Sequence, residues 1–310
     1  IRDSLSATVS NPQEFGESLI EEKITLVSSS GSPRSGQHFL FMNPEVSTNF
    51  SAARLFIHCI RAGFRTIVFT QSRKITELIH VWASQLSPGL RNKISSYRAG
   101  FMPQERREIE KRLAKGDLLG VVSTSALEMG IDIGYLDICL LVGYPGTIIN
   151  TLQRGGRVGR SGRDSLVILI AKPDALDQYF MKHPKEFFTR QPENAVINLD
   201  NPYITTGHIM CASKELPLTE EDKHYFTQGF DRAVRILSDD NQITRTRNGW
   251  KYIGKTRPVA KVKLNNISDE NIAVILGSKL LETMDLNQGF REAHEGAIIL
   301  HQGEPYVVKS

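Results

Sequence analysis

The chain contains 310 residues, and because single domains usually contain about 100–200 residues, we expect about two domains. Hydrophobic residues make up 40% and charged residues 23% of the chain, a balance that excludes a disordered or fibrous protein. No uninterrupted apolar stretch approaches the roughly 18 residues of a transmembrane helix. The formal net charge of +4 permits nucleic-acid binding without requiring it.

The three cysteines and eight histidines indicate neither a metal site nor a disulfide framework. Cys59, Cys139 and Cys211 form no Cys-x-x-Cys pair, and the histidines show no spacing typical of metal ligands. We therefore expect no metal site formed by these residues, and a reducing compartment.

From residue 49 to residue 171, helical and strand patterns alternate as in a parallel α/β domain. Helical periodicity predicts three helices, at 49–63, 72–87 and 103–115. Short apolar runs predict strands at 66–70, before Tyr97, at 119–123, 136–142 and 166–171. This alternation predicts a doubly wound parallel sheet with helices on both faces.

After Lys172 the pattern changes, and prolines separate aromatic-rich helical pieces. Residues 203–239 are predicted to be helical, and 242–254 to form a hairpin around Asn248-Gly249, a combination that fits a winged helix. On the predicted wing, three side chains are candidates for contacts with phosphates or a base: Arg245, Arg247 and Trp250. Beyond Val259, the segments 298–301 and 306–309 predict the start of a small β-rich domain.

The densest cationic stretch is Gln153-Arg-Gly-Gly-Arg-Val-Gly-Arg160, followed by Arg163. Planar guanidinium groups suit bidentate contacts with phosphate oxygens, and glycines let the backbone approach a ligand closely. The stretch therefore predicts a phosphate clamp. The alternative interpretation is that the arginines only decorate a loop after a helix.

This stretch resembles motif VI of superfamily 2 helicases, whose pattern is Q/H-x-x-G-R-x-G-R. The resemblance implies that Arg157 and Arg160 are arginine fingers, which reach the γ-phosphate of ATP held by another RecA-like domain. It also implies that Gln153 occupies the family's nucleotide-coupling position. We expect these three residues to be the catalytic contribution of the chain.

Upstream, Thr124-Ser-Ala-Leu-Glu-Met-Gly-Ile-Asp132 follows a predicted strand and resembles motif V. The resemblance implies that Thr124 and Ser125 contact the nucleic-acid backbone. It places Gly130 and Asp132 at the nucleotide edge of the interdomain cleft. Taken alone, the stretch also fits a helix cap followed by a glycine stop.

Two further stretches resemble nucleic-acid contacts of the same helicases. Thr66-Ile-Val-Phe-Thr-Gln-Ser72 resembles motif IV, which implies phosphate contacts by the residues after the strand: Gln71, Ser72 and Arg73. In Tyr97-Arg-Ala-Gly100, which resembles a family loop, Arg98 is the expected backbone contact. The basic residues between 61 and 115 equally fit the solvated side of the helix at 103–115.

The amino terminus resembles motif III, S-A-T-x-x-N-P, through Ser6-Ala7-Thr8 and Asn11-Pro12. That motif couples the domains and follows the ATP-binding motifs, so we expect the chain to be a downstream piece of a longer polypeptide. The chain contains no G-x-x-x-x-G-K-[ST] phosphate loop and no acidic box for Mg²⁺. The segment 31–38 has the glycine spacing but lacks the lysine. We expect ATP and Mg²⁺ to be bound mainly by an upstream RecA-like domain.

Longer stretches, including Gly143-Tyr-Pro-Gly-Thr147 and Glu215-Leu-Pro-Leu218, resemble the DUF1998-associated repair helicases, which group bacterial mitomycin repair factor A with fungal RecQ4-like enzymes. The resemblance implies an ATP-dependent 3′–5′ DNA helicase in DNA repair, acting on single-stranded DNA or DNA with a 3′ single-stranded tail. It implies a location in the bacterial cytoplasm with the nucleoid, or in a eukaryotic nucleus, and no membrane partner.

With that resemblance, the expected organisation has five parts. They are the end of the first RecA-like domain (1–15), a linker (16–48), the second RecA-like domain (49–190), a winged-helix-like domain (191–255) and a small β-rich region (256–310). We expect this chain alone to be inactive as an ATPase. Two alternatives stay open: a non-catalytic nucleic-acid-binding or scaffolding fragment, and an RNA-directed helicase of the same superfamily, because phosphate contacts do not distinguish the base.

Overall fold

A computed structural model describes residues 8–20, 22–29, 31, 35–128, 133–159, 162–198, 201–226, 229–260, 262 and 271–309. The chain divides into two compact units. The sheet unit comprises Leu5–Ser10, Ser28–Glu193 and Asn271–Ser310, and the winged unit comprises Ile1–Ser4, Asn11–Val27 and Asn194–Glu270. No helix that the structure describes is long and apolar enough to cross a membrane.

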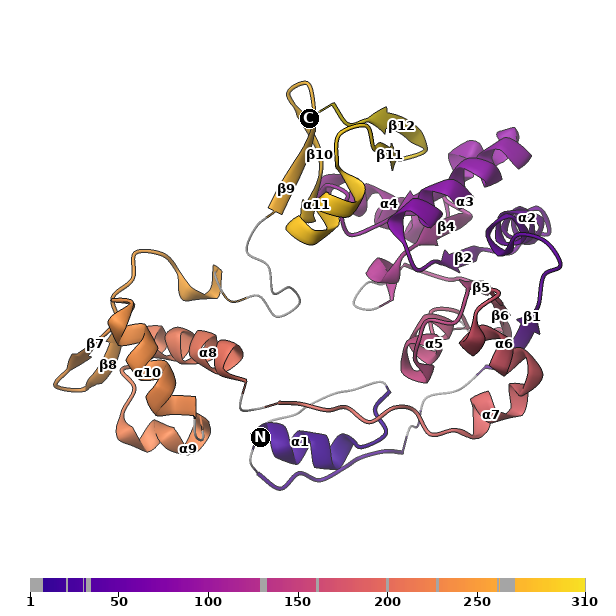
Figure 1. The fold of residues 1–310 in the computed structure, drawn as a ribbon. Helices are drawn as coiled ribbons and strands as arrows, with labels where there is room; N and C mark the ends of the chain where they lie inside the picture. The colour runs from indigo at the N-terminus through magenta and orange to yellow at the C-terminus, as the bar shows by residue number, and fades with distance from the viewer. Residues whose placement is uncertain are drawn as a thin grey trace. The chain divides into compact units, whose positions relative to one another are not determined.

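A parallel six-stranded sheet in the order β1-β6-β5-β2-β4-β3 forms the centre of the sheet unit (Figure 1). Its strands are β1 (Gln37–Met42), β2 (Thr66–Phe69), β3 (Ile94–Tyr97), β4 (Gly120–Ser123), β5 (Ile138–Val142) and β6 (Ser165–Ile170). The predicted doubly wound α/β fold is thereby confirmed.

The edge strand β1 lies inside the stretch 16–48, which the sequence indicated as a linker. It pairs with β6 along its whole length, from Gln37 opposite Ser165 to Met42 opposite Ile170. As an edge strand it is only partly buried. The apolar run Phe39-Leu-Phe-Met42 is a strand signal in the sequence, so the assignment of this stretch to a linker is wrong.

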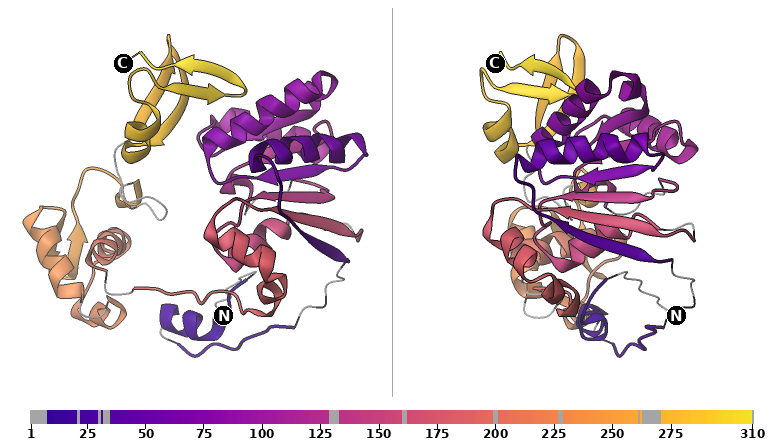
Figure 2. Two further views of the ribbon diagram at one scale, coloured as in Figure 1. Left: turned by 45° about the vertical axis from the view of Figure 1, so that its right-hand side comes forward. Right: turned by 90° about the vertical axis from the view of Figure 1, so that its right-hand side faces the viewer.

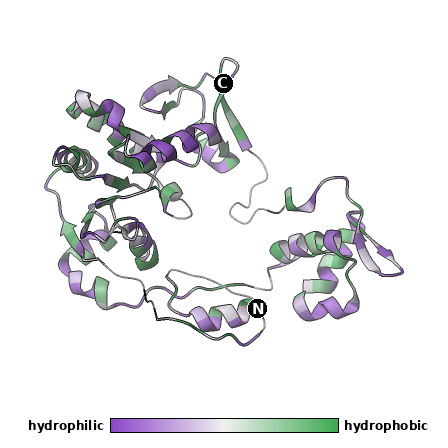
Figure 3. Ribbon diagram, turned by 180° about the vertical axis from the view of Figure 1, so that it is seen from behind, coloured by the Kyte–Doolittle hydropathy of each residue, from purple (hydrophilic) through white to green (hydrophobic). Residues whose placement is uncertain are grey.

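Helices cover both faces of the sheet (Figure 2). One face carries α2 (Thr48–Arg61) and α3 (Arg73–Leu86). The other face carries α4 (Pro103–Lys115), α5 (Ile148–Gly155), α6 (Ala175–Lys182) and α7 (Pro184–Thr189). Side chains alternate between the two cores, as for Ile67 and Phe69 on one face and Val68 on the other. The central strands are accordingly hydrophobic along their length, as Figure 3 shows.

Asp177, near the start of α6, holds together the ends of β5 and β6. Its buried carboxylate accepts hydrogen bonds from the amide of Tyr144 at 3.0 and 3.1 Å and from the amide of Lys172 at 2.7 Å. Burial raises the pKa of Asp177, and these two amides act in the opposite direction. The carboxylate is thus the acceptor for two backbone donors that would otherwise be buried and unsatisfied.

We expect Asp177→Ala to destabilise the sheet unit by about 1–3 kcal/mol per unsatisfied amide, and Asp177→Asn to destabilise it less because one carbonyl oxygen remains. Trp82 in α3 reports on the sheet unit once the second tryptophan is removed by Trp250→Phe. Urea unfolding followed by Trp82 fluorescence measures the effect. The exposed Glu108→Ala is the matched control, and equal stability of the Ala variant and this control would contradict the clamp.

The C-terminal part of the sheet unit forms two hairpins joined by a short helix. These elements are β9 (Asn271–Leu276), β10 (Lys279–Asp285), α11 (Leu286–Glu292), β11 (Ile298–His301) and β12 (Glu304–Val307). The hairpins pack beside α3 and the β3 edge of the sheet, where the amide of Gly303 donates to Glu77 at 3.0 Å. The predicted small β-rich region is confirmed.

The winged unit contains helices followed by a hairpin, as predicted. They are α8 (Pro202–Glu215), α9 (Lys223–Phe226), α10 (Gly229–Asp239), β7 (Ile243–Thr246) and β8 (Gly249–Tyr252), preceded by α1 (Pro12–Ile20). Trp250 on the wing packs edge-on against Phe230 with ring centroids 5.9 Å apart, and the guanidinium of Arg245 lies 4.9 Å from its ring centre. This tryptophan is therefore part of its own unit's core.

Short 3-10 segments complete the described elements, namely η1 (Pro88–Lys93), η2 (Ser125–Leu127), η3 (Glu220–Asp222) and η4 (Pro258–Ala260).

Candidate nucleic-acid and nucleotide interface

Three neighbouring strands end at the same level of the sheet. Phe69, the last residue of β2, pairs with Ser123 of β4, and Ser123 pairs with Tyr97 of β3. The amide of Thr70 also donates to the carbonyl of Ser123 at 2.8 Å. Because the strands are parallel, the three stretches expected to bind nucleic acid leave the sheet side by side at its carboxyl edge. This edge is where α/β sheets usually bind ligands.

At this edge, the motif IV residues are held by local contacts. The Gln71 amide donates to the carbonyl of Tyr144 at 2.6 Å, and its oxygen accepts from Lys172. Ser72 caps α3 by accepting from the amide of Ile75 at 3.2 Å. Arg73, the first residue of α3, is half-buried.

The motif V residues follow β4 at the same edge. Thr124 is half-buried, and its hydroxyl accepts from the amide of Ala126 at 3.4 Å. Ser125 is exposed at the start of η2. Ser72, Thr124 and Ser125 thus place three hydroxyl groups at this edge, and hydroxyl groups are common donors to phosphate oxygens.

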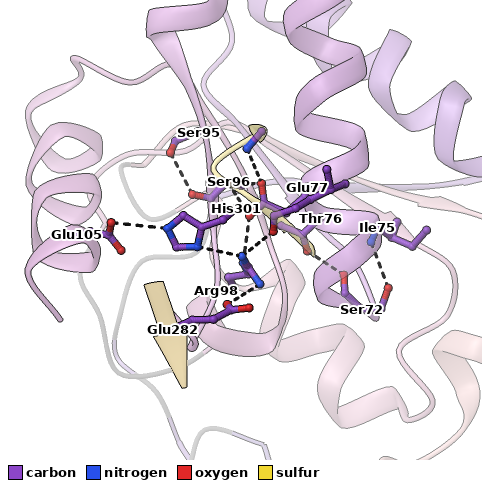
Figure 4. A network of polar contacts seen from close by, with 12 residues as sticks. Ser72, Ile75, Thr76, Glu77, Ser95, Ser96, Arg98, Glu105, Glu282 and His301 are labelled. Atoms are coloured by element: carbon purple, nitrogen blue, oxygen red, sulfur yellow. Dashed lines mark hydrogen bonds and ion pairs between the residues drawn. The ribbon is translucent and has the colours of Figure 1, made fainter. Parts of the chain in front are cut away.

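Arg98 requires a correction, because its side chain is not available to a strand at this edge. The residue is 2% exposed, and its guanidinium contacts Glu77 at 3.0 Å and Glu282 at 2.8 Å (Figure 4). It also donates to the carbonyl of Leu300 at 2.8 Å and lies 3.3 Å from Nδ1 of His301. The expected phosphate contact is thus replaced by a buried ionic cluster that joins β3 and α3 to the C-terminal hairpins.

Burial has the largest effect on the pKa values of the side chains around Arg98. It raises the pKa of Glu77 and of Glu282, although the positive charge of Arg98 favours their ionised forms. Burial likewise lowers the pKa of His301, whose imidazole lies between Arg98 and Glu105. The cluster therefore depends on Arg98 to keep two carboxylates charged inside the protein.

We expect Arg98→Met to destabilise the sheet unit by about 3–5 kcal/mol, because it leaves Glu77 and Glu282 without a counter-ion. Urea unfolding followed by Trp82 fluorescence in a Trp250→Phe background measures the loss. The exposed Arg107→Met is the matched control. Adding Glu77→Gln and Glu282→Gln to Arg98→Met should restore part of the stability. A loss no larger than that of the control would show that the cluster is not stabilising.

The cationic stretch 153–163 begins in α5 and continues beyond its end. Arg154 is buried, pairs with the carboxylate of Glu128 at 2.8 Å and lies 5.5 Å from the ring centre of Phe69. Arg157 is 6% exposed, and its Nε and Nη2 donate to the backbone carbonyl of Glu128 at 2.8 and 2.5 Å. The half-buried Gln153 lies in the last turn of α5.

The sequence patterns did not single out Glu128, although it connects two of the motifs. It lies within the stretch that resembles motif V, and it binds two arginines of the stretch that resembles motif VI. The signal for Glu128 in the sequence was its negative charge within a mostly uncharged segment. These contacts join the segment after β4 to α5 and to the residues that follow it.

The glycines of the cationic stretch have a structural reason of their own. Gly159 has a φ of +79°, and a Cβ at this position would lie 2.6 Å from Oγ of Ser165. The backbone at Gly159 therefore lies close to β6, and the fold itself requires a glycine here.

Several predicted site residues lie outside the described residues, namely Ser6, Ala7, Gly130, Asp132 and Arg160. Thr8 is half-buried in the sheet unit. In the winged unit, Asn11 exchanges two hydrogen bonds with the backbone of Ala195, at 2.8 and 3.2 Å. Within the described part of the chain, no three His, Cys, Asp or Glu side chains group as metal ligands do.

Comparison with known families gives two matches. The helicase conserved C-terminal domain matches residues 51–162, which include the carboxyl-edge residues and the cationic stretch up to residue 162. The winged helix domain of the ATP-dependent helicase HRQ1 matches residues 197–267. The uncharacterized ATP-dependent helicase YprA of Bacillus subtilis is 35% identical over 98% of this chain. The chain is homologous to the HRQ1 and YprA helicases.

Two further comparisons agree with this homology. HRQ1 of Saccharomyces cerevisiae is 30% identical over 99% of the chain. The crystal structure of the DUF1998 helicase MrfA bound to DNA and AMPPNP is 34% identical, with a TM-score of 0.83 over 97% of this chain and 44% of that chain. The resemblance drawn from the motifs is thereby confirmed. The chain spans 43% of YprA and 30% of HRQ1, less than half of either relative.

Proposed function

We propose that this chain is the C-terminal motor part of an ATP-dependent DNA helicase that moves 3′ to 5′ and acts in DNA repair. In this proposal the sheet unit is the second RecA-like domain. Its carboxyl edge contacts the phosphates of single-stranded DNA, or of DNA with a 3′ single-stranded tail. The five contacting residues are Gln71, Ser72, Arg73, Thr124 and Ser125. The MrfA structure contains DNA, which favours DNA over RNA as the partner.

The observation that carries the proposal is the contact of Glu128 with Arg154 and Arg157. It connects the segment that follows Thr124 at the nucleic-acid edge with the arginine-rich stretch. A motor needs such a rigid connection, because a change at the nucleotide must alter the grip on the strand.

The arginine-rich stretch fits a polyphosphate, because every charged side chain in 153–163 is cationic. We propose that Arg157 and Arg160 act as fingers toward ATP bound mainly, with Mg²⁺, by an upstream RecA-like domain. Gly130 and Asp132 lie at the nucleotide edge in this proposal, and Gln153 couples the nucleotide to the strand. Ser6, Ala7 and Thr8 couple the two domains. In this proposal, ATP hydrolysis supplies the free energy that moves the helicase along the strand.

The burial of Arg157 favours an alternative role for this residue, namely a positioning role. Mutation of Arg157 distinguishes this role from the finger role. Its two hydrogen bonds to Glu128 are typical of a residue that positions a neighbouring segment. A chain that only binds nucleic acid needs no arginine finger. In that alternative Arg157 shapes the motif V segment and contributes nothing to the transition state.

We expect Arg157→Ala in the complete helicase to lower kcat for ATP by about 10³-fold or more, the range found for arginine fingers, with DNA affinity within a few-fold of wild type. Steady-state ATP hydrolysis and strand-binding titrations measure the two effects. Arg107→Ala, which removes an exposed arginine of α4 outside this stretch, is the control and should keep its turnover. Normal turnover in the Arg157 variant would exclude the finger assignment. Reduced DNA affinity with normal turnover would indicate the positioning role.

A further inference from the structure

A cavity of 390 Å³ lies between the start of α3 and the C-terminal part of the sheet unit. Its volume is within the range of about 300–1,000 Å³ that is usual for ligand sites. Ser72, Arg73 and Lys74 line it on one side, so it adjoins the carboxyl edge of β2. The segment from Glu282 to Leu300 lines the opposite side.

Basic side chains line this cavity from both sides. Arg73 and Lys74 come from α3, and Arg291 and His294 come from α11 and the loop after it. Two carboxylates also line it. Glu282 is paired with Arg98 at 2.8 Å, whereas the exposed Glu292 accepts from the Gln288 amide at 3.0 Å. The three cationic side chains Arg73, Lys74 and Arg291 outnumber the two carboxylates that line the cavity.

The positive charge of Arg73 acts on the Glu282 carboxylate and favours its ionised form. The Nη1 atom of Arg73 is inaccessible to solvent and makes no hydrogen bond. A Cβ on Gly100 would lie 3.0 Å from this atom and 3.0 Å from Oε2 of Glu282, so the Arg73 guanidinium is confined beside this carboxylate at the cavity wall. The amino-terminal end of the 14-residue helix α3 adds a positive dipole at the same place.

We propose that this cavity binds a phosphate group of the nucleic-acid strand, with Arg291 and His294 as contacts from the C-terminal segment. The proposal rests on the nucleic-acid binding proposed above and extends that surface beyond the helicase C-terminal domain match at 51–162. A nucleic-acid strand is favoured over an acidic peptide because the cavity continues from Ser72, at the edge where the other phosphate contacts are expected.

Arg98 is the positioning residue for this site. It lies between the two walls and fixes Glu282 of β10 and the carbonyl of Leu300 of β11 to the α3 side (Figure 4). Its charge stays buried in the cluster, so it sets the separation of the walls without contacting the strand.

The test is a fluorescence-anisotropy titration of the full chain with a labelled single-stranded oligonucleotide at several salt concentrations. One lost phosphate contact lowers the slope of log affinity against log salt by roughly 0.7, which corresponds to about fivefold weaker binding at 0.1 M salt. We expect this change for Arg291→Glu. Glu292→Gln should strengthen binding, because it removes one negative charge from the cavity wall. Arg107→Glu, on the exposed face of α4 and away from the cavity, is the matched control.

The outcomes separate this site from the proposed function. If the Arg291 and Glu292 variants match the Arg107 control in affinity and slope while the wild type binds DNA, the site is refuted and the function stands. If the wild type binds no oligonucleotide, the proposed function itself is contradicted. If the Arg291 variant loses binding of polyglutamate and keeps its oligonucleotide affinity, the cavity is a peptide site and the proposal is overturned.

Discussion

The parallel register of β2, β4 and β3 is the constraint on which the rest of the site depends. Because Phe69, Ser123 and Tyr97 end their strands at one level, the residues that follow must emerge together at one edge. Residues from three distant parts of the sequence thereby form a single surface. A shift of one residue in any pairing would move the following segment to the other face and destroy that surface.

Two buried arginines connect this surface to the rest of the sheet unit. Arg154 pairs with Glu128 and joins the segment after β4 to α5, whereas Arg98 joins α3 and β3 to the C-terminal hairpins. Buried ion pairs contribute little net stability compared with apolar packing, but removing one partner is costly. We therefore interpret both clusters as devices that fix relative positions. One holds the segment after β4 against α5, and the other holds the C-terminal hairpins beside α3.

The sequence patterns predicted the central strands, the helices around them and the winged unit, because each is a strongly periodic or fully buried element. They missed β1, because its single short apolar run, Phe39-Leu-Phe-Met42, does not by itself determine the type of element. They also assigned Arg98 to the wrong environment. An arginine in a loop after a strand looks like a phosphate contact. Its partners are Glu77, 21 residues before it, and residues about 200 positions after it. Glu128 was missed for the same reason, since its arginine partners become visible only in three dimensions.

The central claim is that this chain supplies half of a motor whose fingers act on a nucleotide held by another domain. The most direct measurement is ATP hydrolysis stimulated by single-stranded DNA, for this chain alone and after mixing it with a separately produced upstream RecA-like domain. The account predicts no hydrolysis by the chain alone and DNA-stimulated hydrolysis in the mixture. Hydrolysis by the chain alone, or no hydrolysis in a mixture whose domains are shown to associate, would contradict it.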